Sequence, residues 1–119
     1  MREKIKDIDR LMHILEAIGY IQQFMQGKTM DHLREDKLLF FGVVKNIEII
    51  GEAANMLTNE FRSERTEVSW QEIIDMRHVL VHGYYTVSSQ FIWDTYCNDL
   101  PTLRQQVQQY LDELSSAEV

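Results

Sequence analysis

The chain has 119 residues, of which 45% are apolar, and this predicts one globular domain over residues 1–119, with frayed ends at 1–3 and 115–119. Its formal net charge of −7 excludes a broadly basic nucleic-acid-binding surface, so any contact with nucleic acid must be local. One cysteine, Cys97, excludes an internal disulfide, and we expect its thiol to be packed. Neither a bilayer-length apolar run nor a secretory leader is present, which predicts a cytoplasmic protein without a membrane segment.

Apolar residues recur at helical spacing along nearly the whole chain, and no segment shows the alternation typical of a strand. A first helix is predicted from Lys4 to Gln26, and a short helical turn over 31–35 follows it. A second long helix is predicted from Asp36 to Asn59. The segment from Phe61 to Val68 is predicted to be a polar connection without secondary structure.

The third helix is predicted from Trp70 to His82. Ser69, followed three positions later by Glu72, has the pattern of a capping box at the start of this helix. Gly83 is a natural place for the helix to end, because glycine readily adopts the backbone conformation that terminates helices.

The fourth helix is predicted to begin at Ser88 or Ser89 and to reach Leu114. Pro101 lies inside it and has no backbone N–H, so it should kink the helix or split it after Leu100. Four amphipathic helices joined by short links predict an all-α fold, an up-and-down four-helix bundle.

The second long helix has apolar residues on more than one side, beginning with the run Leu38-Leu39-Phe40-Phe41. A small bundle with more apolar surface than its own core can cover often buries the excess against a second copy. We therefore expect a homodimer.

A cluster of residues able to act on phosphate surrounds the predicted end of the third helix. Arg77, His78, His82, Tyr84 and Tyr85 lie within nine positions. Arginine binds phosphate in a two-pronged manner, histidine exchanges protons near neutral pH, and a tyrosine hydroxyl can donate, accept and be modified. The helix dipole favours the protonated form of His82 in the last turn. The cluster suits phosphodiester chemistry without a cofactor, whereas Tyr85 is expected to pack.

Each candidate residue also has an ordinary structural interpretation. Arg77 can form a surface ion pair with Asp75, with Glu72 or with a residue of another helix. His82 can cap the last carbonyls of its helix. Glu52 lies in a stretch of otherwise small or apolar residues, where it either neutralises some basic side chain or orients Arg77 or His82.

Two histidines one helical turn apart, His78 and His82, also raise the possibility of a zinc site. The glutamate that follows the first histidine in metalloprotease helices is missing, since Val79 stands there. A third ligand would have to come from His13, His32 or a distant carboxylate. We therefore expect no metal site.

The pattern Arg77-x4-His82-x-Tyr84 resembles the Arg-x4-His-x-Tyr signature of HEPN domains, which are small helical RNA-cleaving modules. His78 fits the polar residue that commonly follows the arginine in that family. Two further segments are similar to the HepT-like toxin branch. They are Asn46-Ile47-Glu48-Ile49-Ile50-Gly51-Glu52-Ala53-Ala54 and Ser69-Trp70-x-x-Ile73-Ile74-x-Met76-Arg77, and the similarity extends from Ile8 to Leu114.

This resemblance implies a metal-independent endoribonuclease that acts as a dimer, with two copies of the motif facing a shared cleft. Arg77 and His82 would be catalytic, while His78, Tyr84 and Glu52 would bind substrate or support them. The resemblance also implies a bacterial or archaeal toxin, neutralised by a minimal nucleotidyltransferase antitoxin that adenylylates Tyr84. The substrate would be RNA, such as tRNA or mRNA, and not DNA, because the reaction needs a 2′-hydroxyl.

Two other functions are compatible with the same residues. The chain could be a non-catalytic nucleotide- or protein-binding subunit that assists a partner nucleotidyltransferase, or a structural dimer with an incidental motif. For RNA binding, further local contacts could come from Arg62, Arg65 and Arg104.

Overall fold

The computed structural model describes residues 2–83 and 86–117, and these ranges contain helices and loops but no strand. The helices are α1 (Arg2–Met25), α2 (Met30–Glu35), α3 (Lys37–Met56), α4 (Asn59–Glu64), α5 (Trp70–His82), α6 (Ser89–Asp94) and α7 (Leu100–Ala117), with a π-helical segment η2 (Thr95–Asp99) between the last two. The predicted all-α class is confirmed. No helix in the described part of the chain is both long and apolar enough to cross a membrane.

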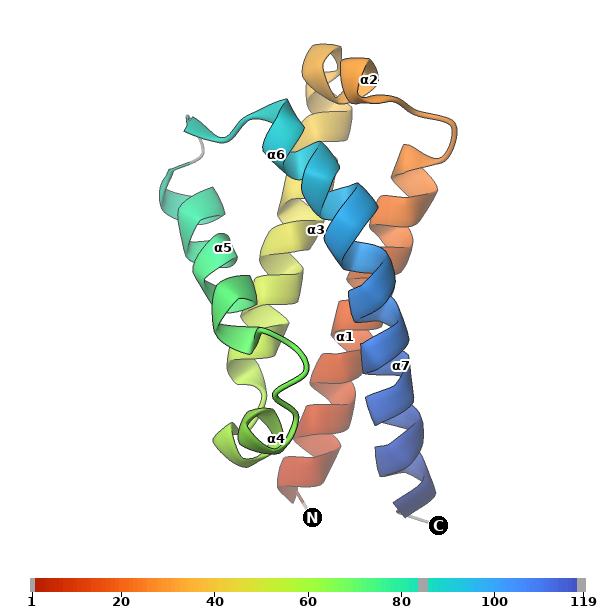
Figure 1. Ribbon diagram of the computed structural model, residues 1–119, viewed down its shortest axis with the longest axis vertical. Coiled ribbons are helices and arrows are strands. Elements are labelled where there is room, and N and C mark those ends of the chain that lie inside the picture. The colour runs from red at the N-terminus through yellow and green to blue at the C-terminus, as the bar shows by residue number, and fades with distance from the viewer. Residues whose placement is uncertain (1, 84–85, 118–119) are drawn as a thin grey trace.

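The packed centre of the molecule consists of α1, α3 and α7, with α1 packed against both of the others (Figure 1). α5 runs along α3 in the opposite direction, and α3 is the helix on which it mainly packs. The core residues recur at helical spacing, as the amphipathic pattern predicts. They include Leu11, Ile14, Ile18, Ile21, Val43, Ile47, Ile50, Ala54, Leu103 and Val107.

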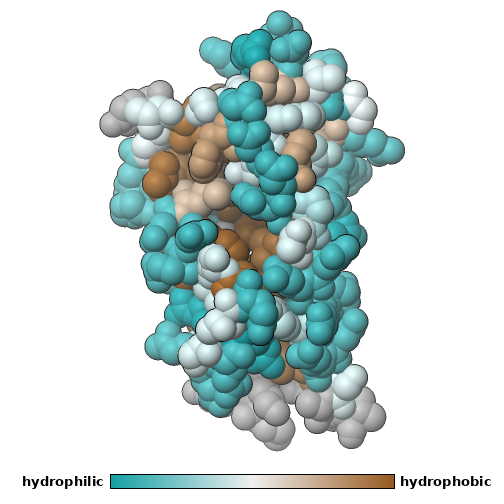
Figure 2. Space-filling model, viewed as in Figure 1, coloured by the Kyte–Doolittle hydropathy of each residue, from teal (hydrophilic) through white to brown (hydrophobic). Residues whose placement is uncertain are grey.

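A groove separates α5 from the η2–α7 side of the molecule. Its volume is about 330 Å³, and its apolar lining includes Ile50, Ile73 and Leu103. In Figure 2, apolar residues are visible near the centre of this face between polar margins. α5 is therefore held from one side, so its position depends on how closely it fits against α3.

The segment from Phe61 to Val68 is not simply the polar connection that the sequence predicted, because α4 occupies its first part. Thr58 caps α4 by accepting a hydrogen bond from the Phe61 backbone N–H. Phe61 is buried and packs against the rings of Trp70 and Tyr110, with centroids 6.0 and 5.9 Å away. The sequence prediction was wrong here because one aromatic anchor is enough to hold a short helix among polar residues.

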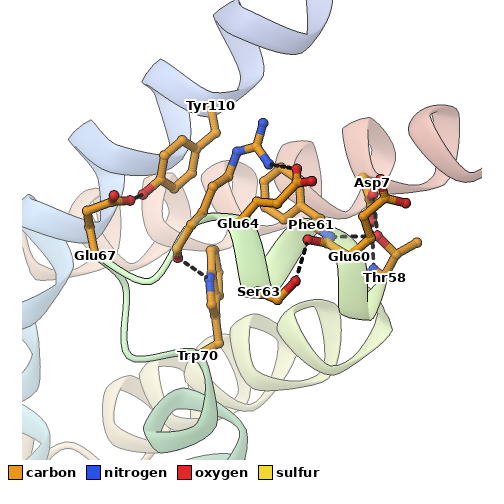
Figure 3. Close-up of polar contacts among 10 residues, drawn as sticks. Asp7, Thr58, Glu60, Phe61, Ser63, Glu64, Glu67, Trp70 and Tyr110 are labelled. Atoms are coloured by element: carbon orange, nitrogen blue, oxygen red, sulfur yellow. Dashed lines mark hydrogen bonds and ion pairs between the residues drawn. The ribbon is translucent and has the colours of Figure 1, made fainter.

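The capping box predicted at the start of α5 is absent, since the Ser69 side chain makes no capping hydrogen bond. One local and one long-range side-chain hydrogen bond hold this turn instead (Figure 3). The Trp70 indole donates to the Arg65 carbonyl at 2.9 Å, and the Tyr110 hydroxyl donates to Glu67 at 2.8 Å. Burial of the phenol and its hydrogen bond to Glu67 raise the pKa of Tyr110 to about 12. The start of the motif helix is therefore fixed by its contacts with α7.

A buried carboxylate joins α1 to the start of α4. Asp7 is almost fully buried and accepts hydrogen bonds from the backbone N–H and the hydroxyl of Thr58, both at 2.8 Å (Figure 3). A buried carboxylate is tolerated when its oxygens are satisfied in this way. The contact places α4, and the loop that follows it, against the centre of the molecule.

The last long helix is interrupted, as Pro101 predicts, but one turn earlier than expected. The helix widens into η2, where the Leu100 backbone N–H donates to the Thr95 carbonyl five residues back. Pro101 cannot donate, and its ring crowds the carbonyl of Cys97 in a regular helix, which explains the wider turn just before it. Ser88, one of the two predicted capping residues, caps α6, and α7 continues to Ala117.

Cys97 is exposed, so the prediction of a packed thiol was wrong.

Candidate active site

Arg77 lies on the face of α5 that packs against α3, directly over Gly51. A Cβ atom added to Gly51 would clash with the Arg77 Cβ and would lie 3.0 Å from the Ile73 carbonyl oxygen. Glycine is therefore the residue that lets the two helices approach this closely at this point. The sequence did not predict that Arg77 would lie over this glycine.

The neighbouring residue, Glu52, forms an ion pair with Arg77, with 3.1 Å between Glu52 Oε2 and Arg77 Nε. Glu52 is therefore the partner of Arg77. Asp75, another partner that the sequence allowed, instead accepts a hydrogen bond from Gln71. Both side chains of the ion pair are partly exposed, at 38% for Arg77 and 50% for Glu52. The terminal amino groups of Arg77 make no hydrogen bond or ion pair with any described residue, so they can bind an anion from solvent.

His78 and His82 lie one turn apart on the exposed side of α5, with ring centroids 4.5 Å apart. His82 is the last residue of α5, where the helix dipole favours a positive charge. The Gly83 backbone N–H closes the helix by donating to the Val79 carbonyl. Within residues 2–83 and 86–117, His82 makes no side-chain hydrogen bond, so the capping interpretation of this side chain has no support there.

Helical geometry places Arg77, His78 and His82 at different angles around α5, so their side chains do not point toward one position. At about 100° per residue, His78 lies about 100° and His82 about 140° around the helix from Arg77. His82 is also about 7.5 Å further along the axis. Tyr84 and Tyr85 lie outside the described residues. One copy of α5 therefore presents the guanidinium and the His82 imidazole on different sides of the same helix end.

The other basic residues named from the sequence lie elsewhere. Arg65 extends over the Phe61 ring, with its guanidinium carbon 4.1 Å from the ring centroid, and Arg62 bonds to Asn59. Both are close to the start of α5, about 20 Å along that helix from His82. Arg104 of α7 bonds to Gln22 of α1. These arginines do not join Arg77 in one basic surface.

The histidines do not gather into a metal site in the described part of the chain. No group of three or more histidine, cysteine, aspartate or glutamate side chains there could hold a metal ion. His32 is occupied in a capping box with Thr29 at the start of α2, and His13 is exposed on α1. The pair His78 and His82 therefore has no third protein ligand among these residues.

Comparison with known proteins assigns the family. The family model described as ribonuclease HepT-like matches residues 14–110, which include both α3 and α5. This chain belongs to the HepT-like ribonuclease family. The resemblance seen in the sequence is thereby confirmed. No solved structure matches the chain.

Curated relatives of this HepT-like chain carry ribonuclease names. "Probable ribonuclease HepT" of Thermococcus cleftensis is 35% identical over 96 residues, which are 81% of this chain and 87% of that protein. A protein of Caldanaerobacter subterraneus named as a candidate RNase is 35% identical over 103 residues, 87% of this chain and 92% of its own. A Methanocaldococcus jannaschii protein, named both a gamma-glutamylcyclotransferase and a candidate RNase, is 35% identical over 114 residues. That match covers 96% of this chain but only 50% of the relative, so the chain spans half the length of that protein.

Proposed function

We propose that this HepT-like protein is a metal-independent endoribonuclease that uses Arg77 and His82 at a cleft between two copies of the chain. The observation that carries the proposal is the position of Arg77. It is seated over Gly51 and oriented by Glu52, its terminal amino groups are available, and α5 ends one turn and a half further on at His82. A guanidinium held in this way is ready for a phosphate without the cost of ordering a free side chain.

In the proposed reaction, one imidazole removes the proton of a ribose 2′-hydroxyl and the 2′-oxygen attacks the adjacent phosphorus. The bond from phosphorus to the 5′-oxygen breaks, which leaves a 2′,3′-cyclic phosphate and a 5′-hydroxyl. A second imidazole supplies the proton that the departing 5′-oxygen takes. Arg77 stabilises the additional negative charge on the phosphate oxygens. His82 from each of two copies would supply the base and the acid.

A dimer is supported by apolar surface that a single copy leaves exposed. Leu38 is 86% exposed at the start of α3. Several large apolar side chains on α1 and α3 are exposed as well. They are Met12, Tyr20, Phe24, Ile49 and Met56. The 140° that separates His82 from Arg77 on one helix gives a second reason, because two copies can bring an arginine and a histidine to one phosphate from opposite sides.

The direct test is cleavage of purified tRNA and total RNA by the purified protein in the presence of EDTA. We expect cleavage that persists in the chelator and leaves 2′,3′-cyclic phosphate ends. An oligonucleotide with 2′-deoxyribose throughout should remain intact, because it lacks the attacking hydroxyl. If the protein binds RNA or nucleotides and no turnover occurs, the alternative of a non-catalytic subunit that assists a nucleotidyltransferase is favoured.

We further propose that the protein is the toxin of a toxin–antitoxin pair and that a minimal nucleotidyltransferase is its antitoxin. Transfer of AMP from ATP to the Tyr84 hydroxyl, with release of pyrophosphate, would place a bulky anion two positions after His82. That phosphate would compete for Arg77 with the phosphate of RNA.

After co-expression with the nucleotidyltransferase, we expect the protein to gain the mass of an AMP group on the peptide that contains Tyr84. Mass spectrometry of the digested protein measures this gain, and Tyr84→Phe is the matched variant that should stay unmodified. Host growth should stop when the protein is expressed alone and recover with the partner. Full recovery with unmodified Tyr84 would show that the partner inhibits by binding instead.

A further inference from the structure

A second pocket opens between α3 and α5, next to the candidate active site. Its volume is about 270 Å³. Val44 and Leu80 are buried and form its floor, while Phe40 and Phe41 stand at its wall. The Phe41 ring is half exposed and meets Phe40 edge to face, with 5.5 Å between centroids. The pocket therefore offers an aromatic surface that solvent can reach.

The pocket lies one helical turn from Arg77, on the His82 side. Because α3 and α5 are antiparallel, the turn of α5 after Arg77 lies opposite the turn of α3 before Glu52. Val81 follows Arg77 by four residues, Glu48 precedes Glu52 by four, and both line the pocket. One turn is about 5.4 Å of axis. A phosphate held by Arg77 would thus have the pocket beside it.

Among the described residues that line this pocket, Glu48 is the only charged one. Its side chain is half buried and makes no hydrogen bond or ion pair with another residue of the described ranges. An ionised carboxylate accepts hydrogen bonds and cannot donate them. A ligand for this pocket should therefore be flat and largely apolar, with an N–H group at one edge.

We propose that this pocket binds an unpaired RNA base beside the scissile phosphate, with Phe41 as the stacking surface and Glu48 as the acceptor for an amino group of the base. The proposal rests on the endoribonuclease function proposed above. Unpaired RNA bases are commonly bound by stacking on aromatic side chains and by hydrogen bonds to their edges. A carboxylate accepts from the N4 amino group of cytosine. Cytosine and adenine offer an amino group at that edge, whereas uracil offers only its N3–H, which lies between two carbonyl oxygens that a carboxylate repels.

The test uses three short unstructured oligoribonucleotides, an all-uridine strand and two in which a single cytidine or adenosine replaces the central uridine. We expect wild type to cleave beside cytidine or adenosine with a kcat/KM about tenfold above that for the all-uridine strand. Glu48→Gln should bring the three values to within about twofold of one another, because the amide can also donate to a carbonyl. Phe41→Ala should raise KM for all three about five- to a hundredfold and leave kcat unchanged.

Phe91→Ala is the matched control, because Phe91 is also an exposed phenylalanine but lies on α6 outside the pocket. It should leave KM and base preference as in wild type, and thermal melting should show that all three variants fold. Equal cleavage of the three strands by wild type, or variants with unchanged preference and KM, would overturn the proposal. So would a Phe41→Ala protein that sediments as a smaller species with unchanged base preference, since the pocket would then be a contact between copies.

Binding of 2′-O-methyl versions of the same strands separates this proposal from the proposed function. These strands lack the attacking hydroxyl, so their affinity, read by fluorescence anisotropy of an end label, does not depend on turnover. A cytidine or adenosine preference that Glu48→Gln removes would support the pocket even if no RNA were cleaved. Cleavage without any such preference would leave the nuclease proposal intact and reject the base pocket.

Discussion

The Arg77→Ala and His82→Ala variants are each expected to cleave RNA about a hundredfold to a thousandfold more slowly than wild type. In the proposed reaction, loss of Arg77 would remove the positive charge that stabilises the phosphate oxygens as negative charge develops on them, an effect of this order in enzymes. Loss of His82 would remove proton transfer, which contributes a similar factor. Single-turnover rates on one tRNA in EDTA measure both effects.

Arg104→Ala and His13→Ala are the matched controls, because each removes the same kind of side chain from an exposed site away from α5. Both should cleave at the wild-type rate. Equal cleavage by all four variants would indicate a contaminating nuclease or a different site.

Mixing the Arg77→Ala and His82→Ala proteins adds a test of the shared cleft. A mixed dimer keeps a single His82 and a single Arg77, so it should stay slow if the imidazoles of both copies serve as base and acid, whereas a return of activity would show that one imidazole is enough.

Gly51→Ala is expected to destabilise the protein and also to reduce cleavage, whereas Gly42→Ala in the same helix should do neither. A methyl group on Gly51 would clash with the Arg77 Cβ, and α5 would have to move away from α3. At Gly42 the nearest side-chain atoms to an added methyl are those of Phe24, at 3.7 Å, which is an ordinary contact. Both changes add the helical preference of alanine, so that contribution cancels between them.

The difference in free energy of unfolding between the two variants should therefore report the overpacking at Gly51 alone, about 1–3 kcal/mol. Urea denaturation followed by circular dichroism measures it, with Gly42→Ala at least as stable as wild type. At a temperature where both variants are folded, Gly51→Ala should still cleave RNA more slowly, because Arg77 is displaced with its helix. Two variants of equal stability and activity would contradict the close seating of Arg77 against α3.

Local patterns predicted the helices well where the helix ends depend on nearby residues. α5 runs from Trp70 to His82 as expected, because its apolar spacing acts within a few residues, although Gly83 ends it with φ −117° and not in the left-handed conformation. The turn before α5 was predicted wrongly. It is held by a contact between residues about forty positions apart, the hydrogen bond from Tyr110 to Glu67, and not by a cap from Ser69. A sequence window cannot contain such contacts. For the same reason α4 was missed, because Phe61 becomes an anchor only when Trp70 and Tyr110 meet it.

The sequence by itself determined the helical class, the place of the motif at the end of α5 and the family, because all three depend on residue types at short, regular spacing. It left the partner of Arg77 open among Asp75, Glu72 and another helix. Tertiary structure decided this in favour of Glu52, because the missing side chain of Gly51 lets α5 settle against α3 at that turn. It also decided that Glu48 and Phe41 line a pocket beside the site. Such contacts depend on how two helices pack against each other, and the residues of either helix alone do not determine this packing.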